Sequence, residues 1–165
     1  MHRLFLGALA FVALSMTALE SASAQTAKDQ LIATWRLTAA TATDGTGTTV
    51  NTRYGDKPDG FLSITGDGRA IAMLVNAATP KYGAMTNDVA GNIMKSITAW
   101  AAKYEVDGAA PTADGTKITF RIDAGADPNL NGTGQAFMFK MDGGKLILKS
   151  IVPPGAVTGP TTLTF

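Results

Sequence analysis

The chain of 165 residues carries 14 lysines and arginines against 13 aspartates and glutamates, a net charge of +1 with histidine neutral. Its basic residues are scattered singly, so the basic patch of a nucleic-acid-binding protein is missing and we expect no nucleic-acid partner. The chain contains no cysteine, which excludes disulfide bonds and thiolate nucleophiles. Nucleic-acid binding and catalysis by a cysteine are therefore not expected of this protein.

Residues 1–24 have the pattern of a secretory signal peptide. Arg3 supplies a positive charge, Leu4–Leu19 form an uncharged apolar run, and Ala22–Ala24 fit a small-residue cleavage site. The apolar run is shorter than the ~20 residues of a membrane-spanning helix, which favours cleavage over anchoring. We therefore expect an exported protein, periplasmic or secreted, with no integral membrane segment after cleavage.

The remaining chain, residues 25–165, has the length of one domain and shows no internal repeat or linker. His2, the single histidine, leaves with the signal peptide. The mature chain therefore lacks Ser-His and Cys-His nucleophile pairs and the usual ligands of zinc, copper and haem. We assign no catalytic residue, no metal site and no cofactor. Whether the protein is an enzyme stays open, with a non-enzyme favoured.

The first element expected in the mature chain is a single helical turn over Ala27–Ala33. Short runs of β-strand character follow, and Asp-Gly pairs, the strongest short hairpin signal, supply most of the turns between them. The pairs are Asp44-Gly45, Asp59-Gly60, Asp67-Gly68, Asp107-Gly108, Asp114-Gly115 and Asp142-Gly143. The predicted strands are Trp35–Ala42, Thr48–Tyr54, Phe61–Thr65, Arg69–Val75, Ala99–Val106, Lys117–Asp123, Gln135–Met141, Lys145–Ile151 and Thr161–Phe165.

Apolar and polar residues alternate in these runs, most regularly where Ile118, Phe120 and Ile122 alternate with polar neighbours. One segment, Thr86–Thr98, instead has apolar residues at helical spacing and an N-cap at Thr86 or Asn87. The sequence therefore predicts an all-β fold of antiparallel, meandering strands, a sandwich or a barrel, with one short helix between the fourth and fifth strands.

Several stretches, in this order, resemble the lipocalin-like domain family of small bacterial and fungal proteins. They are LIATWRL, RYGDKPDGFLSITGDGRAIAML, KYEVDG and DPNLNGTGQAFMFKMDGGKLILKSIVPPG. The resemblance spans nearly all of the mature chain, from Leu31 to the C-terminus. The resemblance implies an antiparallel up-and-down barrel, here of eight or nine strands. The best-known lipocalins hold one small apolar molecule inside such a barrel.

The resemblance also gives Trp35 a role. In lipocalins a helical turn leads into a Gly-x-Trp motif whose indole plugs the closed end of the barrel, and Ala33-Thr34-Trp35 is similar, with Ala33 in place of the glycine. The arginine that accompanies this motif is missing, and Lys149 is the nearest basic candidate. We expect Trp35 to be the structural plug of the barrel or, in another β fold, a core aromatic.

In a barrel every second residue of a strand faces the interior. If the larger apolar and aromatic side chains of the predicted strands face inward, the predicted ligand-binding residues are Leu37, Tyr54, Phe61, Met73, Trp100, Tyr104, Phe120, Phe137 and Phe139. These side chains either surround a cavity or fill the interior completely, and the sequence leaves both alternatives open. The helix over Thr86–Thr98 is likewise either a lid at the barrel mouth or a decoration packed outside it.

One loop, Asp127–Gly132, fits the opening of a calcium-binding loop, D-x-[DN]-x-[DN]-G. The twelfth position is Met138, where such loops place a bidentate carboxylate. No helices are expected on either side of it. A turn-rich loop without metal is therefore the favoured interpretation.

The leading hypothesis is a monomeric protein that binds a small apolar or amphipathic molecule, with Tyr54, Tyr104 or Arg121 orienting a polar end. A first alternative is an isomerase or cyclase without histidine, for which Glu105 is the acid to test, although its alternation points it outward. A second alternative is an envelope interaction or inhibitor module with a filled barrel, which a large exposed apolar patch would favour.

Overall fold

The computed structural model describes residues 27–44, 46–50, 52–79, 81, 83–108, 111–152 and 158–165, so the predicted signal peptide lies outside the described residues. One antiparallel sheet of 10 strands, in the order β1-β4-β5-β6-β7-β8-β9-β10-β2-β3, forms most of this structure. The strands are β1 (Ala33–Arg36), β2 (Ala39–Asp44), β3 (Thr49–Val50), β4 (Pro58–Ile64), β5 (Arg69–Asn76), β6 (Ile97–Val106), β7 (Thr116–Gly125), β8 (Gly134–Asp142), β9 (Lys145–Ser150) and β10 (Thr158–Thr164). The predicted all-β antiparallel fold is confirmed.

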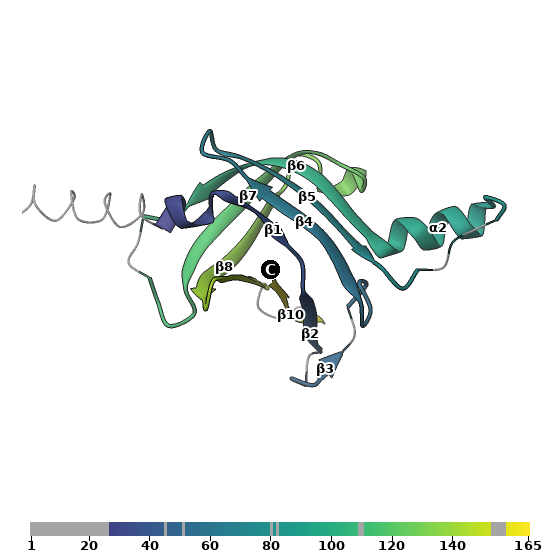
Figure 1. Ribbon diagram of the computed structural model, residues 1–165, viewed down its shortest axis with the longest axis horizontal. Coiled ribbons are helices and arrows are strands. Elements are labelled where there is room, and N and C mark those ends of the chain that lie inside the picture. Colours follow the sequence, from purple (N-terminus) through teal and green to yellow (C-terminus); the bar gives the residue numbers. More distant parts are fainter. Residues whose placement is uncertain are drawn as a thin grey trace, which may run out of the picture.

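From β4 to β10 each strand pairs with the next one along the chain, and the sheet curls so that one face is concave (Figure 1). The alternation of side chains explains which face is inside. In β7, for example, Ile118, Phe120 and Ile122 are buried, whereas Lys117 and Arg121 on the other face are exposed. Burial of one side chain in two gives each strand a single inward face, and these faces together form the core.

The segment predicted as one strand, Trp35–Ala42, is two strands that belong to opposite ends of the sheet. β1 pairs with β4, and β2 pairs with β10. Between them the chain changes partner within two residues: the Leu37 N–H donates to Gly60 O over 2.9 Å, and the Thr38 N–H donates to Thr164 O over 2.8 Å. The first segment of the domain therefore joins the two ends of the sheet covalently.

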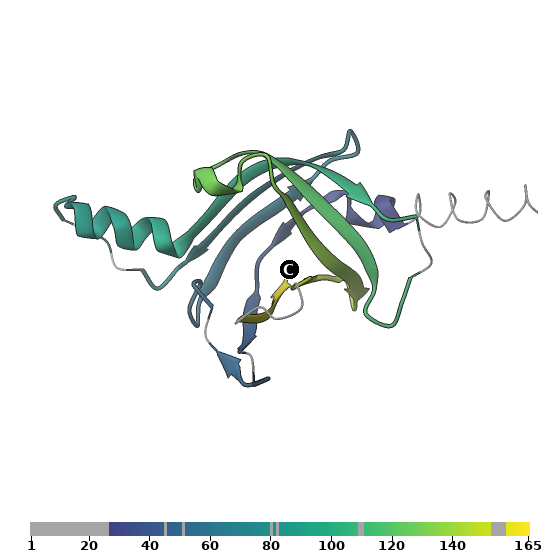
Figure 2. The same cartoon turned by 180° about the vertical axis from the view of Figure 1, so that it is seen from behind.

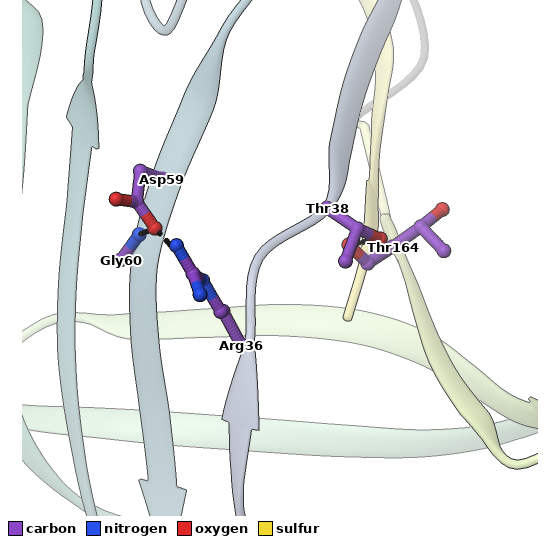
Figure 3. A network of polar contacts seen from close by, with 5 residues as sticks. All are labelled: Arg36, Thr38, Asp59, Gly60 and Thr164. Carbon is purple, nitrogen blue, oxygen red and sulfur yellow. Dashed lines mark hydrogen bonds and ion pairs between the residues drawn. The ribbon is translucent and has the colours of Figure 1, made fainter.

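The side chains at this crossing also bond to both neighbouring strands, one to β4 and the next but one to β10 (Figure 3). Arg36 reaches Asp59 on β4, with Nε 3.2 Å from the carboxylate oxygen, whereas the Thr38 hydroxyl donates to Thr164 O on β10 over 3.0 Å. The ion pair is exposed and screened by solvent, so the backbone hydrogen bonds and the covalent link carry more of the connection.

The strand pairing itself is not closed, so the predicted closed barrel of eight or nine strands is wrong. β1 is one edge of the sheet, and the short β3 lies at the other edge beyond β2. The physical reason is the crossing, because a chain that divides its hydrogen bonds between two partners at Leu37 and Thr38 ends one ladder before it begins the next.

Two further expectations on this side of the molecule are wrong. The predicted strand Thr48–Tyr54 is a strand only at Thr49–Val50, and residues 52–55 form a turn in which the Gly55 N–H donates to Thr52 O over 3.0 Å. The Asp59-Gly60 pair lies inside β4 rather than at a hairpin turn. Gly60 has a φ of 130°, and a Cβ there would lie 2.0 Å from Met73 O, so glycine is required where β4 presses against β5.

The helix α2 (Asn87–Ser96) lies between β5 and β6; the strand count differs from the prediction because the first predicted strand is two strands. The Thr86 side chain caps it by accepting from the Val89 N–H over 3.3 Å. α2 has no buried residue and extends away from the curled sheet rather than across its opening, opposite the helical residues 27–31 (Figures 1 and 2). In the described ranges no helix combines the length and apolar character needed to span a membrane.

Candidate functional site

A cavity of about 310 Å³ lies within the concave face of the sheet. Its walls come from β2, from all strands between β4 and β10, from the turn at residues 52–55 and from the short helix η1 (Pro128–Leu130). The lining residues are Ala42, Thr52, Arg53, Tyr54, Leu62, Ala72, Leu74, Thr98, Trp100, Phe120, Leu130, Gln135, Phe137, Leu148, Ser150, Thr161, Leu163 and Phe165. The predicted hydrophobic interior is therefore not completely filled.

Three aromatic rings from neighbouring strands form one wall, which we call the aromatic wall: Trp100 on β6, Phe120 on β7 and Phe137 on β8. The Trp100 and Phe120 ring centroids are 5.1 Å apart at an interplanar angle of 45°, and Phe120 meets Phe137 edge-on with centroids 5.9 Å apart. Such pairs contribute about 0.5–1.5 kcal/mol each beyond area burial. The rings thus hold one another in place and form a preorganised apolar wall of the cavity.

Small side chains leave the space in front of this wall. Ala72 on β5 is directly opposite Trp100 in the ladder, and Ala42 on β2 also lines the cavity. A larger side chain at either position would extend into the cavity, since inward-facing residues of a curled sheet share one interior.

We call the polar end of the cavity, made by the turn at residues 52–55 and by Thr98 and Ser150, the rim. The Tyr54 hydroxyl donates to Thr98 Oγ1 over 2.7 Å. Burial raises the pKa of Tyr54 above its ordinary value of 10.0, although the hydrogen bond to Thr98 and the charge of Arg53 act in the opposite direction. Tyr54 is therefore a neutral phenol at physiological pH, and its hydrogen bond joins the turn to β6.

Four of the predicted ligand-binding residues line the cavity together: Tyr54, Trp100, Phe120 and Phe137. Three others, Leu37, Tyr104 and Phe139, are buried in the core but do not line the cavity. Tyr54 reaches the site from a turn rather than from the strand in which it was predicted.

The predicted inward orientation of Phe61 and Met73 is wrong. Their side chains are 49% and 53% exposed, and they are opposite each other on the outer face of β4 and β5, beside Ile71. The phase was misassigned because both faces of these two strands carry apolar residues, and a shift of one residue exchanges the two faces. On these two strands the residues that line the cavity are instead Leu62, Ala72 and Leu74, which the sequence did not single out.

Trp35 lies at the end of the sheet where residues 27–31 form their helical turn. Its indole N–H donates to Leu31 O over 2.9 Å, and the half-buried ring packs against the core without lining the cavity. The last turn of a helix leaves carbonyl groups without partners, so the indole satisfies one of them and fixes the helical turn to β1. Lys149, the candidate to accompany the indole, instead places Nζ 3.6 Å from the Asp114 carboxylate.

Two residues proposed to orient the polar end of a ligand lie elsewhere. The Tyr104 hydroxyl donates to Thr65 O over 3.0 Å, outside the cavity lining. Arg121 is exposed on the outer face, where its guanidinium lies 3.3 Å from the Glu105 carboxylate. Glu105, the acid considered for an enzyme, therefore also points away from the cavity, and no carboxylate belongs to the described lining.

The loop that resembles a calcium-binding sequence uses its first carboxylate for another purpose. Asp127 caps η1, and its Oδ1 accepts from the Asn129 backbone and side-chain nitrogens, both over 3.0 Å. Across the described segments, no group of three or more acidic, histidine or cysteine side chains is arranged to hold a metal ion.

Comparison with known proteins agrees with this architecture. No curated protein and no solved structure matches the chain. The family model described as a lipocalin-like domain matches residues 32–164, which include every strand of the sheet and every residue of the cavity lining except Phe165. The protein therefore belongs to the lipocalin-like domain family.

Proposed function

We propose that the protein binds a small hydrophobic or amphipathic molecule in the cavity between the aromatic wall and the rim. The observation that carries this proposal is the cavity itself, because it combines a preorganised apolar wall with a few polar groups at one end. Its volume of about 310 Å³ is at the lower end of the range of about 300–1,000 Å³ for ligand pockets, so the ligand is small.

Binding would come mainly from burial of apolar ligand surface, at about 25 cal/mol per Å². The aromatic wall adds stacking or edge contacts for a planar ligand. The polar rim gives the ligand one orientation, with its apolar end directed toward Leu62, Phe120 and Leu148. The alternative of an isomerase or cyclase lacks an acid in the described lining, since Glu105 lies on the outer face.

The proposed function predicts that a panel of small apolar and amphipathic compounds contains ligands that raise the melting temperature of the mature protein. A ligand present at 100 times its Kd stabilises by about 2.7 kcal/mol, which corresponds to a rise of about 5–10 °C for a domain of this size. Ala72→Leu, which fills the space in front of Trp100, should weaken binding at least about tenfold.

Ala124→Leu is the matched control, because Ala124 is exposed on β7 and outside the cavity lining. It should leave the affinity unchanged. A panel without any ligand, or equal affinities for the two variants and the unaltered protein, would count against the cavity as the binding site.

We propose further that the protein is exported after cleavage between Ala24 and Gln25. The charge at Arg3, the apolar run Leu4–Leu19 and the small residues before Gln25 support this proposal. N-terminal sequencing of the protein recovered from the periplasm or the medium should begin at Gln25. A chain that keeps Met1 and stays with the cytoplasmic fraction would overturn it.

We propose that the protein is a monomer, and one observation favours a second candidate role in contacts with a partner. Phe61, Ile71 and Met73 are 49%, 60% and 53% exposed and form an apolar patch on the outer face of β4 and β5. Sedimentation velocity over increasing concentration should show a monomer throughout. Self-association that Phe61→Ser abolishes would refute the monomer and support an interaction module.

A further inference from the structure

The charge of the cavity lining comes from one residue. Of the described residues that line the cavity, Arg53 alone is ionised, and it is exposed at the rim. The turn that begins at Thr52 and ends at Gly55 sets its position: the Gly55 N–H donates to Thr52 O, and Gly55 has a φ of 60°. Consecutive residues of this turn thus place a buried phenol, Tyr54, inside the cavity and a guanidinium beside it at the rim.

This guanidinium is available to a ligand. Within the described ranges, the ion pairs of arginine and lysine side chains involve Arg36, Arg69, Arg121 and Lys149, and none involves Arg53. An arginine presents five N–H donors in a planar fork that matches a carboxylate. The rim therefore carries a positive charge that no described carboxylate neutralises by direct contact.

Two hydroxyl groups at the rim, those of Thr98 and Ser150, can also donate a hydrogen bond to a ligand. Thr98 Oγ1 accepts from the Tyr54 hydroxyl over 2.7 Å, and Ser150 Oγ accepts from the Thr161 N–H over 2.8 Å. Each hydroxyl has one proton to donate, and an accepted hydrogen bond leaves that proton free. The rim is therefore rich in donors, and among its described residues Arg53 alone carries a formal charge.

A groove continues outward from Arg53 between α2 and the loop before η1. Its volume is about 590 Å³, and Arg53, Met94, Lys95 and Asp127 are among the residues that line it. Lys95 adds a second positive charge to that of Arg53, and Asp127, whose carboxylate accepts hydrogen bonds from Asn129, adds one negative charge, so these three side chains leave a net positive charge in the groove. The approach to the cavity therefore does not reverse the positive character of the rim.

We infer that the cavity selects small monoanionic amphipathic ligands, namely carboxylates whose head group lies at Arg53 and whose apolar body lies against the aromatic wall. This inference rests on the proposed function and adds the charge of the ligand to it. An anion matches the one charge and the free protons of the rim, whereas a cation would meet Arg53 at short range without a described acid in the lining to compensate it.

The test is isothermal titration calorimetry with three compounds of nearly equal shape: 3-phenylpropanoate, 3-phenylpropanamide and 3-phenylpropylamine. In the mature protein the carboxylate should bind about fivefold to tenfold more tightly than the amide, and the ammonium compound should bind most weakly. Raising the NaCl concentration from about 0.05 M to about 0.5 M should reduce the preference for the carboxylate and leave binding of the amide unchanged.

Arg53→Met keeps an apolar stem and removes the charge, so it should lower carboxylate binding to the level of the amide without changing binding of the amide. Arg53→Lys should retain part of the preference, because it keeps the charge and loses the planar fork. Arg121→Met is the matched control, since Arg121 pairs with Glu105 on the outer face, and it should change nothing.

Equal binding of carboxylate and amide, a preference that survives Arg53→Met, or binding by none of the three compounds would overturn the inference. The proposed function stands or falls separately, because it is contradicted only if the wider panel of apolar compounds also fails to bind. Circular dichroism and the melting temperature of Arg53→Met should match those of the unaltered protein, which separates a change in selectivity from a loss of folding.

Discussion

The fold depends on the point at which the first strand segment changes partner. At Leu37 the backbone N–H still donates to β4, and at Thr38 it already donates to β10. The covalent chain thereby holds together two ends of a sheet whose ladders do not join. A net contribution of about 0.5–1.5 kcal/mol for each hydrogen bond is modest, but the connection also fixes the curl of the sheet and so the existence of an interior.

The cavity is a consequence of this curl and of the size of the side chains that face inward. Trp100, Phe120 and Phe137 pack against one another on adjacent strands, while Ala42 and Ala72 leave the space in front of them. The polar residues of the rim come from the turn at residues 52–55 and from Thr98 and Ser150, near the ends of their strands. The interior of the curled sheet is thus a packed hydrophobic core in one part and a small cavity, with an apolar wall and a polar rim, in another.

The sequence predicts the inward face of a strand correctly where one face alone is apolar, and wrongly where both faces carry apolar residues. Phe120 was placed correctly because its neighbours in β7 alternate with charged and polar residues, whereas Phe61 and Met73 were misplaced because β4 and β5 are apolar on both faces. The crossing at residues 37–38 could not be predicted, since it is made by backbone groups that every sequence contains. The sequence does not point to Arg53, because its neighbours have strand character and the structure instead forms a turn there.

The most direct test of the crossing is native-state hydrogen exchange, followed by NMR, at the amides of Leu37 and Thr38. Thr38 is exposed, so only its hydrogen bond to Thr164 O can protect its amide. The structure predicts that both amides are protected to a degree close to that of the central amides of β4 and β5. Exchange of either amide at the rate of an exposed loop would show that the two ends of the sheet are not held together there.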